Sequence, residues 1–348
     1  MKVPVGILGA TGAVGQRFVQ LLADHPWFEV VELAASDRSA GKPYKDACTW
    51  RLGTPLPESA AARVVKACDE KFESRILFSG LDSSVAGEVE TALANKGHAV
   101  VSNSKNHRMD PDVPLLIPEV NADHLDALAV QRKRTGGGYI VTNPNCSVVG
   151  LALALAPLQR AFGLQEVAVV TLQALSGAGY PGVASMDIAD NVIPYIGGSE
   201  EEKIESEPQK ILGEFSGGTF RPAPFTISSS VHRVDVSDGH TMAVFARLKV
   251  KATPDRVVQA LSEFRGEPQQ RRLPTAPQRP IHVLPQLDRP QPRLDRDREG
   301  GMAVAVGRVR ADKAFDVRFE ALVHNTIRGA AGAAILNAEL MHREGWLQ

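Results

Sequence analysis

Hydrophobic and polar positions alternate regularly over the first 145 residues. Short apolar segments predict strands, and the longer amphipathic segments between them predict helices. The predicted strands cover 3–9, 28–36, 75–81, 98–103 and 138–143, and the predicted helices cover 13–26 and 83–97. Strands separated by helices favour a parallel, doubly wound sheet of the Rossmann type, which binds ligands at the carboxyl ends of its strands.

The pattern changes after residue 145. Long strand patterns with few helices between them occupy 166–175, 225–236, 240–250, 301–312 and 314–323. Helical patterns at 147–162 and 254–265 could cover one face of a mainly antiparallel sheet. The segment 272–301 is rich in Pro, Arg and Asp and predicts an extended loop packed against a neighbour, because free loops of this length are uncommon in compact domains.

These patterns predict an α/β protein of two domains, which a length of 348 residues also favours. Residues 1–145 would form a Rossmann-type dinucleotide-binding domain. Residues 146–325 would form an α+β domain with a mainly antiparallel sheet. A final helical pattern at 327–346 carries small residues on one side, and we expect the segment 326–348 to pack back onto the first domain and complete it.

Charge and composition exclude several classes of function. The chain has 39 Lys and Arg against 40 Asp and Glu, so it has no overall basic surface for nucleic acid. Its apolar runs are too short to span a bilayer, and it begins with a strand pattern rather than a signal peptide. The three cysteines form no CxxC pair, which argues against a disulfide framework and against a metal site. We expect a cytoplasmic protein without nucleic-acid or membrane partners.

Three glycines lie where the first predicted strand turns into the first helix. Gly9, Gly12 and Gly15 allow a tight turn and let backbone N–H groups at the helix start approach a pyrophosphate. Glycine-rich turns also occur for purely structural reasons. This one follows the first strand and opens a helix, and that position predicts dinucleotide binding.

Residues after the second predicted strand bear on the choice between NAD and NADP. An acidic residue there suits the ribose 2′-hydroxyl of NAD, whereas an arginine accommodates the 2′-phosphate of NADP. Ser36, Arg38, Ser39 and Lys42 could donate to a phosphate. Asp37 could instead bind a ribose hydroxyl, or the segment could be a solvated turn. We favour NADP because Arg38 supplies the charge that a 2′-phosphate needs.

Cys146 is the strongest candidate for a nucleophile. It precedes the helical pattern 147–162, so the N–H groups and dipole of the first turn would face its sulfur and favour the thiolate. Asn145 beside it could orient a substrate oxygen. A free cysteine is more often a small buried apolar residue, and this alternative fits Cys48 and Cys68.

Arg233 and His240 could serve the same site. They flank a turn between two strand patterns, and a hairpin would present both at one end of the sheet. The guanidinium could bind a carboxylate, and the imidazole could act as a general acid or base. A lone histidine is more often structural, and His324 is the closest rival for this role.

Four further residues could bind a substrate. Gln173 ends a strand pattern before a glycine-rich loop and could hydrogen-bond an acyl intermediate. Glu200 and Lys203 share one helix face and could bind an amino group and an anion, although such charge runs usually form a solvated helix start. Arg108 could form an anion site near the end of a first-domain strand.

Together these motifs resemble the archaeal and fungal branch of the aspartate-semialdehyde dehydrogenases. The matching segments follow in order along the chain: GATGAVGQRF, SNSKNHRMDPDVPLLIPEVN, NPNCS, SGAGYPG, NVIPYIGGSEEEK, RVDVSDGHT, RPQPRLDRD and HNTIRGAAGAAILNAEL. The resemblance implies NADP-dependent, reversible conversion of L-aspartyl 4-phosphate to L-aspartate 4-semialdehyde and phosphate through a cysteine thioester. That step belongs to lysine, methionine, threonine and diaminopimelate biosynthesis. The resemblance also implies a homodimer or homotetramer, with the second domain serving both catalysis and dimerisation.

The resemblance assigns roles to individual residues. Cys146 would be the nucleophile, His240 the general acid/base, and Gln173 would orient the acyl-enzyme. Arg233 and Glu200 would hold the carboxylate and the amino group of the substrate. The remaining assignments are Arg108, Asn145 and Lys203 in the phosphate site, and Gly9, Thr11, Gly12, Ala13, Val14, Gly15, Ser36, Arg38, Ser39, Leu81, Ser176, Gly177 and Asn325 at the cofactor.

Three other functions stay open at this point. N-acetylglutamyl-phosphate reductases and malonyl-type acyl-CoA reductases share the fold and the thioester chemistry, and a non-catalytic NADP sensor could keep the fold alone. Glu200 argues against the first, because an acetylated amine has no charge to pair with it. The complete catalytic set argues against a sensor, whereas the sequence does not exclude the acyl-CoA reductase. Val231 stands where the family often has a cysteine, which leaves the predicted chemistry unchanged.

Overall fold

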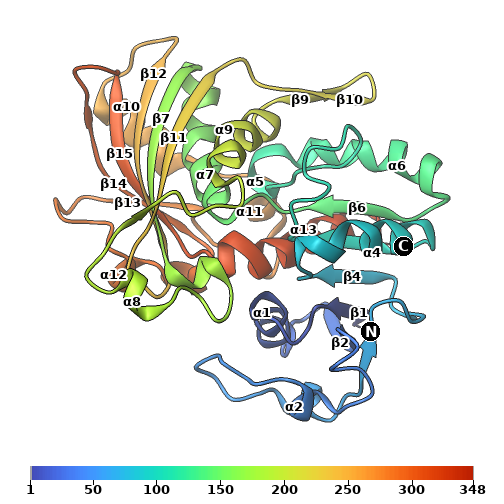
Figure 1. The fold of residues 1–348 in the computed structure, drawn as a ribbon. Coiled ribbons are helices and arrows are strands. Elements are labelled where there is room, and N and C mark those ends of the chain that lie inside the picture. Colours follow the sequence, from blue (N-terminus) through green and yellow to red (C-terminus); the bar gives the residue numbers. More distant parts are fainter. Residues whose placement is uncertain (1, 348) are drawn as a thin grey trace.

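The computed structural model describes residues 2–347 and contains two large sheets (Figure 1). The first is six-stranded in the order β3-β2-β1-β4-β5-β6, and all neighbouring strands are parallel, as predicted for a Rossmann-type sheet. Its strands are β1 (Val3–Leu8), β2 (Phe28–Ala35), β3 (Val65–Ala67), β4 (Ile76–Ser79), β5 (Ala99–Ser102) and β6 (Tyr139–Thr142). The sequence pattern predicted all of them except the short edge strand β3.

Helices pack on both faces of this sheet. Phe18 and Leu22 of α1 are buried in a cluster on one face, and Leu93 and Ala94 of α4 are buried on the other. The helices are α1 (Ala13–Leu22), α2 (Tyr44–Ala47), α3 (Glu58–Ala61), α4 (Ser83–Asn95), α5 (Pro118–Asn121), the 3₁₀ helix η1 (Ala122–Asp126) and α6 (Ala127–Thr135). Both helices predicted for this region are present, and the predicted stop at Gly97 coincides with a φ of +96° there.

The second sheet has seven strands in the order β13-β14-β15-β12-β7-β11-β8. Four of its six neighbouring pairs are antiparallel, so the prediction of a mainly antiparallel sheet is confirmed. Its strands are β7 (Leu164–Gln173), β8 (Ile193–Pro194), β11 (Thr226–Arg233), β12 (His240–Leu248), β13 (Ile281–Leu284), β14 (Val304–Ala311) and β15 (Val317–Val323). A separate two-stranded ribbon consists of β9 (Glu214–Ser216) and β10 (Thr219–Arg221).

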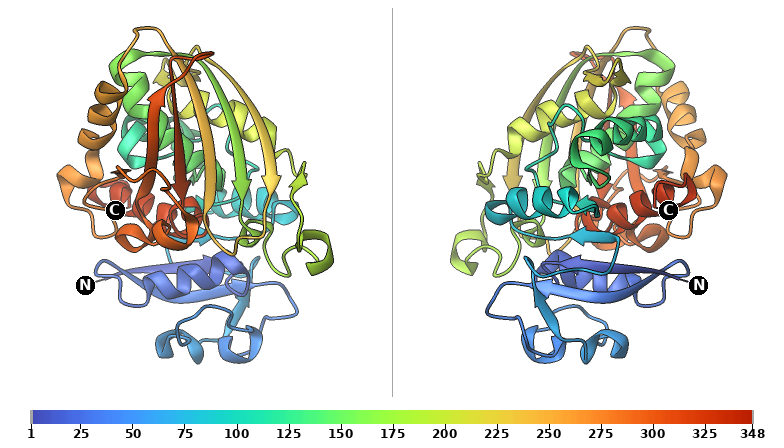
Figure 2. Two further views of the ribbon diagram at one scale, coloured as in Figure 1. Left: turned by 90° about the vertical axis from the view of Figure 1, so that its left-hand side faces the viewer. Right: turned by 90° about the vertical axis from the view of Figure 1, so that its right-hand side faces the viewer.

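Helices cover one face of the second sheet and leave the other open. α7 (Cys146–Phe162), α9 (Glu200–Ile211) and α10 (Pro254–Glu263) share a buried apolar cluster with the sheet. α7 is buried on nearly every side, which explains why its sequence is apolar almost throughout. The left view of Figure 2 shows the strands of the open face in front. The short helices of this region are η2 (Leu175–Ala178), α8 (Ser185–Ile188), α11 (Glu267–Arg271), α12 (Pro292–Asp295) and η3 (Arg298–Gly301).

The end of the chain packs against the first sheet. A π-helical turn, η4 (Ile327–Ala331), leads into α13 (Gly332–Arg343), as the final helical pattern predicted. Ile335 and Leu340 of α13 belong to the same apolar cluster as Val5 and Ile7 of β1. Figure 1 shows this helix running from the second sheet toward the first.

The prediction of a strandless loop at 272–301 is wrong. The segment contains β13, which pairs in parallel with β14 and forms an edge of the second sheet. Its four residues are too short a run to show a strand period between flanking prolines, so local sequence alone did not reveal it.

Within residues 2–347 no helix is both long and apolar enough to cross a membrane. The same residues contain no group of three or more His, Cys, Asp or Glu side chains placed to hold a metal ion.

Candidate active site

The ends of three inner strands, β7, β11 and β12, lie together at one end of the seven-stranded sheet. β7 lies between β11 and β12, so the predicted hairpin between those two strands is wrong. The structure still brings Arg233 and His240 together, because β7 is parallel to β11 and antiparallel to β12. The register pairs Arg233 with Gln173 and Thr241 with Leu172, which sets His240 level with Gln173. The side chains of Gln173, Arg233 and His240 are buried toward the helices, since alternate residues of a strand share a face.

The thiol of Cys146, at the first residue of α7, faces the ring of His240. Sγ lies 3.2 Å from Nε2 of His240, while the backbone N–H of Ala174 donates to Nδ1 of the same ring at 3.0 Å. A neutral imidazole whose Nδ1 is an acceptor carries its proton on Nε2. In this tautomer His240 donates Nε2–H toward the sulfur and cannot accept the thiol proton at that nitrogen.

Burial keeps the thiol and the imidazole neutral. Burial, together with nearby Arg233, lowers the pKa of His240 to about 3. Burial and the Glu200 carboxylate raise the pKa of the Cys146 thiol to about 12, despite opposing effects from nearby cations. The prediction that the helix start favours the thiolate is therefore wrong.

Asn145 also limits what the start of α7 can offer the sulfur. Its Oδ1 accepts the backbone N–H of Ser147 at 2.9 Å and that of Val148 at 3.4 Å, so Asn145 is the N-cap of α7. These N–H groups would otherwise be available to an anion. The helix N-terminus consequently offers little to the sulfur, and the same amide group of Asn145 is not free to bind a substrate through its oxygen.

The Glu200 carboxylate connects several of the predicted substrate residues. Oε1 accepts from Nζ of Lys203 at 2.7 Å, and Oε2 accepts from Nδ2 of Asn145 at 2.9 Å. Nε2 of Gln173 lies 3.4 Å from the same Oε2. The side chains of Glu200 and Lys203 are each 17% exposed, so an incoming ammonium group could reach the carboxylate in place of Lys203.

Arg233 is held by the backbone residue that also binds His240. Nη1 donates to the carbonyl of Ala174 at 2.6 Å, the one hydrogen bond that this guanidinium makes within residues 2–347. Its other N–H groups are available to a carboxylate. Gly177 closes over this pair: a Cβ there would lie 2.8 Å from Nη1 of Arg233 and 2.9 Å from Cε1 of His240, so the site has room only for glycine.

Arg108 lies in the same region but is already paired. It is buried, and it donates to Oε1 of Glu207 at 2.9 Å and to the carbonyl of Asn103 at 2.8 Å. The second oxygen of Glu207 accepts the backbone N–H of Asn145 at 2.7 Å. Glu207 was not predicted from the sequence as a site residue. Its spacing from Glu200 and Lys203 places it on the same face of α9, and that spacing was the available signal.

The turn between β1 and α1 has the geometry of a dinucleotide site. Gly9 has a φ of +71°, and a Cβ on Gly15 would lie 2.1 Å from the carbonyl oxygen of Gly9. Gly12 is the N-cap of α1 and makes no side-chain cap, so the first N–H groups of that helix are available to an anion. The exposed backbone at Gly12 and Ala13 leaves room for a pyrophosphate.

Other predicted cofactor residues lie at the carboxyl ends of neighbouring strands. Ser36, Arg38 and Ser39 form the turn after β2, and the side chains of Ser36 and Arg38 are exposed. Leu81 follows β4, and its backbone N lies beside Gly9. These positions agree with ligand binding outside the carboxyl ends of a parallel sheet.

The segment before η4 connects the dinucleotide turn with the thiol. Asn325 donates to Oγ of Ser176 and accepts the backbone N–H of Gly239, both at 2.8 Å. Nη2 of Arg17, on α1, donates to Oγ1 of Thr326 at 3.1 Å. Gly329 then lies against Cys146, since a Cβ added to it would be 3.0 Å from that of the cysteine.

Glu200→Gln is expected to make Cys146 more reactive toward iodoacetamide at about pH 8. Removal of the carboxylate takes away a group that raises the thiol pKa and frees Lys203, and each pKa unit changes the thiolate fraction about tenfold. Alkylation rates followed by mass spectrometry test this. Glu202→Gln, an exposed position on the same helix, is the control; a variant no faster than that control contradicts the assigned cause.

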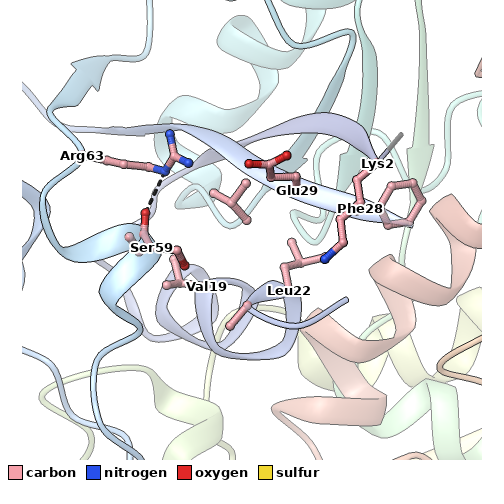
Figure 3. A pocket seen from close by; sticks show the side chains of 10 residues that line it. Lys2, Val19, Leu22, Phe28, Glu29, Ser59 and Arg63 are labelled. Carbon is pink, nitrogen blue, oxygen red and sulfur yellow. Dashed lines mark hydrogen bonds between the residues drawn. The ribbon is translucent and has the colours of Figure 1, made fainter. Parts of the chain in front are cut away.

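A separate cavity of about 290 Å³ lies between α1 and β2 (Figure 3). Nε of Arg63 donates to the carbonyl of Ser59 at 2.9 Å within its wall. Its lining consists of Lys2, Val19, Leu22, Ala23, Phe28, Glu29, Val30, Ser59, Ala60 and Arg63, which include none of the predicted site residues. The candidate site therefore remains the end of the second sheet where Gln173, Arg233 and His240 lie.

Two family models match the chain. The model described as "Semialdehyde dehydrogenase, NAD binding domain" matches residues 4–128, and "Semialdehyde dehydrogenase, dimerisation domain" matches residues 155–328. The aspartate-semialdehyde dehydrogenase of Methanothermobacter thermautotrophicus is 52% identical over 345 residues, covering 98% of this chain and 99% of the relative. That of Schizosaccharomyces pombe is 49% identical and covers 98% of both chains.

Solved structures give the same result. The aspartate semialdehyde dehydrogenase of Candida albicans with NADP superposes with a TM-score of 0.92 at 44% identity, covering 99% of this chain and 100% of that one. Aspartate semialdehyde dehydrogenase II of Vibrio cholerae complexed with ASA superposes with a TM-score of 0.78 at 27% identity, covering 99% of each chain.

Proposed function

Because this chain belongs to the aspartate-semialdehyde dehydrogenase family, we propose that its Cys146 and His240 carry out the family's reaction where α7 begins beside the end of the second sheet. The reaction is the reversible, NADPH-dependent reduction of L-aspartyl 4-phosphate to L-aspartate 4-semialdehyde and phosphate, an oxidoreductase step of amino-acid biosynthesis. The observation that carries the residue assignment is the 3.2 Å contact between Sγ and Nε2, next to Gln173 and Arg233.

NADP is the cofactor, and the chain has residues that fit it. The uncapped start of α1 and the close approach of Gly15 to Gly9 suit a pyrophosphate, and the exposed Arg38 after β2 suits a 2′-phosphate. When bound there, NADP would supply the hydride-transfer chemistry of the reaction.

Glu200 and Arg233 would bind the two charged groups of the substrate. The α-ammonium group takes the place of Lys203 on Glu200, and the α-carboxylate binds the free N–H groups of Arg233. The ammonium of Lys203, released from Glu200, then joins Arg108 in holding the phosphate. A substrate without a free amino group would leave Lys203 on Glu200, which argues against an N-acetylated substrate.

Acyl transfer would follow from the position of the thiol. The sulfur forms a bond to the acyl carbon, and the carbon–oxygen bond breaks with its electron pair leaving on phosphate. The thiol proton leaves with the phosphate, because Nε2 of His240 already holds a proton. Nε2–H instead donates to the oxygen of the tetrahedral adduct, as an oxyanion donor does.

Release of the aldehyde would require cleavage of the carbon–sulfur bond. Once the thioester is reduced, the carbon–sulfur bond would break, its electron pair would return to the sulfur of Cys146, and the aldehyde would leave. The sulfur would then take up a proton from solvent, which restores the thiol. Nε2–H of His240 stabilises the sulfur as it leaves. The donor half of the acid/base role inferred for His240 thus fits its tautomer, whereas the role of base toward the thiol does not.

Arg38→Ala is expected to raise the KM for NADP by about tenfold or more and to leave the KM for NAD nearly unchanged, since only NADP has the phosphate that a charged hydrogen bond would hold. The ratio of kcat/KM for the two cofactors is the measurement. Lys45→Ala removes an exposed cation on the neighbouring α2 and is the matched control. An unchanged preference in Arg38→Ala, or a wild type that prefers NAD, contradicts the assignment.

We also propose that the chain forms a homodimer or homotetramer through the open face of the second sheet. Val170 and Leu172 of β7, an inner strand of the sheet, point out of that face and are 37% and 41% exposed. The matching family model is described as a dimerisation domain, which supports this surface. Sedimentation of the purified chain tests it.

The domain boundaries and the compartment are proposals as well. We place the nucleotide-binding domain at 1–145 with the segment 326–348, and the catalytic and dimerisation domain at 146–325. The shared apolar cluster of α13 and β1 supports the first, and the cluster of α7 with the second sheet supports the other. A cytoplasmic location is supported by the free thiols of Cys48, Cys68 and Cys146.

One assay tests the substrate. Phosphate-dependent reduction of NADP is compared for aspartate semialdehyde, N-acetylglutamate semialdehyde, and malonate semialdehyde with coenzyme A. We expect a strong preference for the first, because Glu200 and Arg233 read its free amino and carboxylate groups. Equal or better turnover of either other aldehyde overturns the substrate assignment.

A further inference from the structure

α9 carries two further charged residues, one acidic and one basic, that the proposed reaction does not use. Glu207 and Lys210 follow Glu200 and Lys203 on the same side of the helix. The first pair is partly open to solvent, whereas Glu207 is 2% exposed and Lys210 is 3% exposed. Buried charges of this kind need specific partners, and both residues have them.

Glu207 connects the anion-binding arginine with the loop of the nucleophile. One carboxylate oxygen accepts from Nη1 of Arg108 at 2.9 Å, and the other accepts the backbone N–H of Asn145 at 2.7 Å. Asn145 directly precedes Cys146. A single buried carboxylate therefore fixes the distance between the guanidinium and the residue before the sulfur.

Lys210 fixes the backbone on the other side of Arg108. Its Nζ donates to the carbonyls of Arg108, Asp110 and Val113 at 2.7, 2.8 and 2.9 Å. All three N–H groups of the ammonium are thus used on the turn that carries Arg108. Burial lowers the pKa of Lys210 to about 8, against the effect of nearby carboxylates.

Arg108 has N–H donors that these contacts do not use. Nη2 donates to the carbonyl of Asn103, and the buried Nε has no hydrogen-bond partner among the described residues. Both oxygens of Glu207 are occupied and buried, so the carboxylate cannot turn away without leaving a buried charge unpaired. Glu207 is thus placed to orient Arg108 rather than to compete with an anion for it.

We propose that Glu207 is a positioning residue of the phosphate site: it holds Arg108 and the backbone of Asn145 in one arrangement, so that the remaining N–H groups of Arg108 meet a tetrahedral oxyanion beside the thiol. This inference rests on the proposed function, in which Arg108 binds the phosphate. Lys210 supports the same arrangement through the backbone.

Glu207→Gln tests the proposal with little change in size. In the carboxylate, Oε1 accepts from Arg108 and Oε2 accepts from Asn145, and glutamine replaces one of these two oxygens with an NH₂ donor, so one of the two contacts is lost. We expect kcat/KM for inorganic phosphate, measured in the oxidative direction, to fall by about tenfold or more, and the KM for aspartate semialdehyde to stay within about twofold, because only the phosphate contacts are displaced. Glu202→Gln, exposed on the same helix, is the matched control and should behave as the wild type.

A double mutant separates positioning from a merely structural role. If Glu207 acts through Arg108, Glu207→Gln should cost much less in the Arg108→Lys background than in the wild type. Equal losses in both backgrounds, or a fall in kcat that matches a loss of titratable Cys146 thiol with both KM values unchanged, overturn the proposal.

A binding measurement keeps this test apart from the proposed function. Inorganic phosphate should protect Cys146 from iodoacetamide, and the phosphate concentration for half-protection should rise by about tenfold in Glu207→Gln, because the oriented guanidinium contributes to binding. An unchanged half-protection concentration overturns the positioning role. A wild type that shows protection but no phosphate-dependent turnover of aspartate semialdehyde would instead reject the proposed function alone.

Discussion

Replacement of Cys146 by alanine is expected to lower kcat by about 10⁴-fold or more, because the covalent route through the sulfur is lost. Serine at this position should be nearly as inactive. Its hydroxyl is a far weaker nucleophile than a thiol, and the site provides no base for it, since Nε2 of His240 already carries a proton. Steady-state assays in both directions give the measurement.

The other two cysteines supply the controls for this prediction. Cys48 is buried, and Cys68 packs with its Sγ 3.5 Å from the carbonyl of Ala35. Cys68→Ser should keep turnover near the wild-type value. A Cys146→Ala variant that folds normally and retains more than about 1% of wild-type kcat would contradict covalent catalysis by this residue.

His240→Ala is expected to lower kcat by about 10²- to 10³-fold, the usual scale for loss of one hydrogen-bond donor to the oxyanion of a tetrahedral adduct. His240→Gln should recover about tenfold of that loss, because the amide of glutamine can donate an N–H from nearly the position of Nε2. A residue acting as a base toward the thiol would give equal losses in the two variants. Equal losses would therefore contradict the donor role.

The pH dependence provides a second measurement on His240. With a pKa of about 3, the imidazole is protonated only below that pH and stays neutral through the range of ordinary assays. The profile of kcat/KM should show no inflection from His240 between about pH 6 and 7, where an unperturbed histidine would titrate. An inflection there that disappears in His240→Gln would contradict the neutral tautomer.

The sequence predicted the elements of both sheets better than their connections. Apolar runs such as 28–36 and 240–250 are long and bounded by turn residues, and they became β2 and β12. The insertion of β7 between β11 and β12 depends on pairing between segments far apart in the chain, which no local pattern contains. Because β7 is parallel to β11 and antiparallel to β12, His240 still lies at the same end of the sheet as Arg233, where a hairpin would also have placed it.

The residues of the candidate site could be named from the sequence, but their electrostatics could not. The structure brings Cys146, His240, Gln173, Arg233 and Glu200 together as the motifs suggested. An asparagine before a helix is a recognised N-cap signal, and its oxygen competes with any anion at that helix start. The raised pKa of the thiol also depends on burial, which a sequence does not specify.

Backbone groups and buried charges formed the part of the site that the motifs did not reveal. Ala174 sets the tautomer of His240 and holds Arg233 through main-chain atoms, so its side chain gives no signal. Glu207 was hidden for another reason: acidic residues on a charged helix are usually solvated, and only the packing of α9 against Arg108 shows that this one is buried.

The proposed reaction passes through a thioester on Cys146, and this intermediate can be trapped. The enzyme is mixed with L-aspartyl 4-phosphate in the absence of NADPH, and the peptide that contains Cys146 is examined by mass spectrometry while released phosphate is counted. We expect one aspartyl group per chain, attached to Cys146 and removable by hydroxylamine, with one phosphate released for each. Phosphate release without this adduct, or an adduct on another residue, would contradict the proposed thioester.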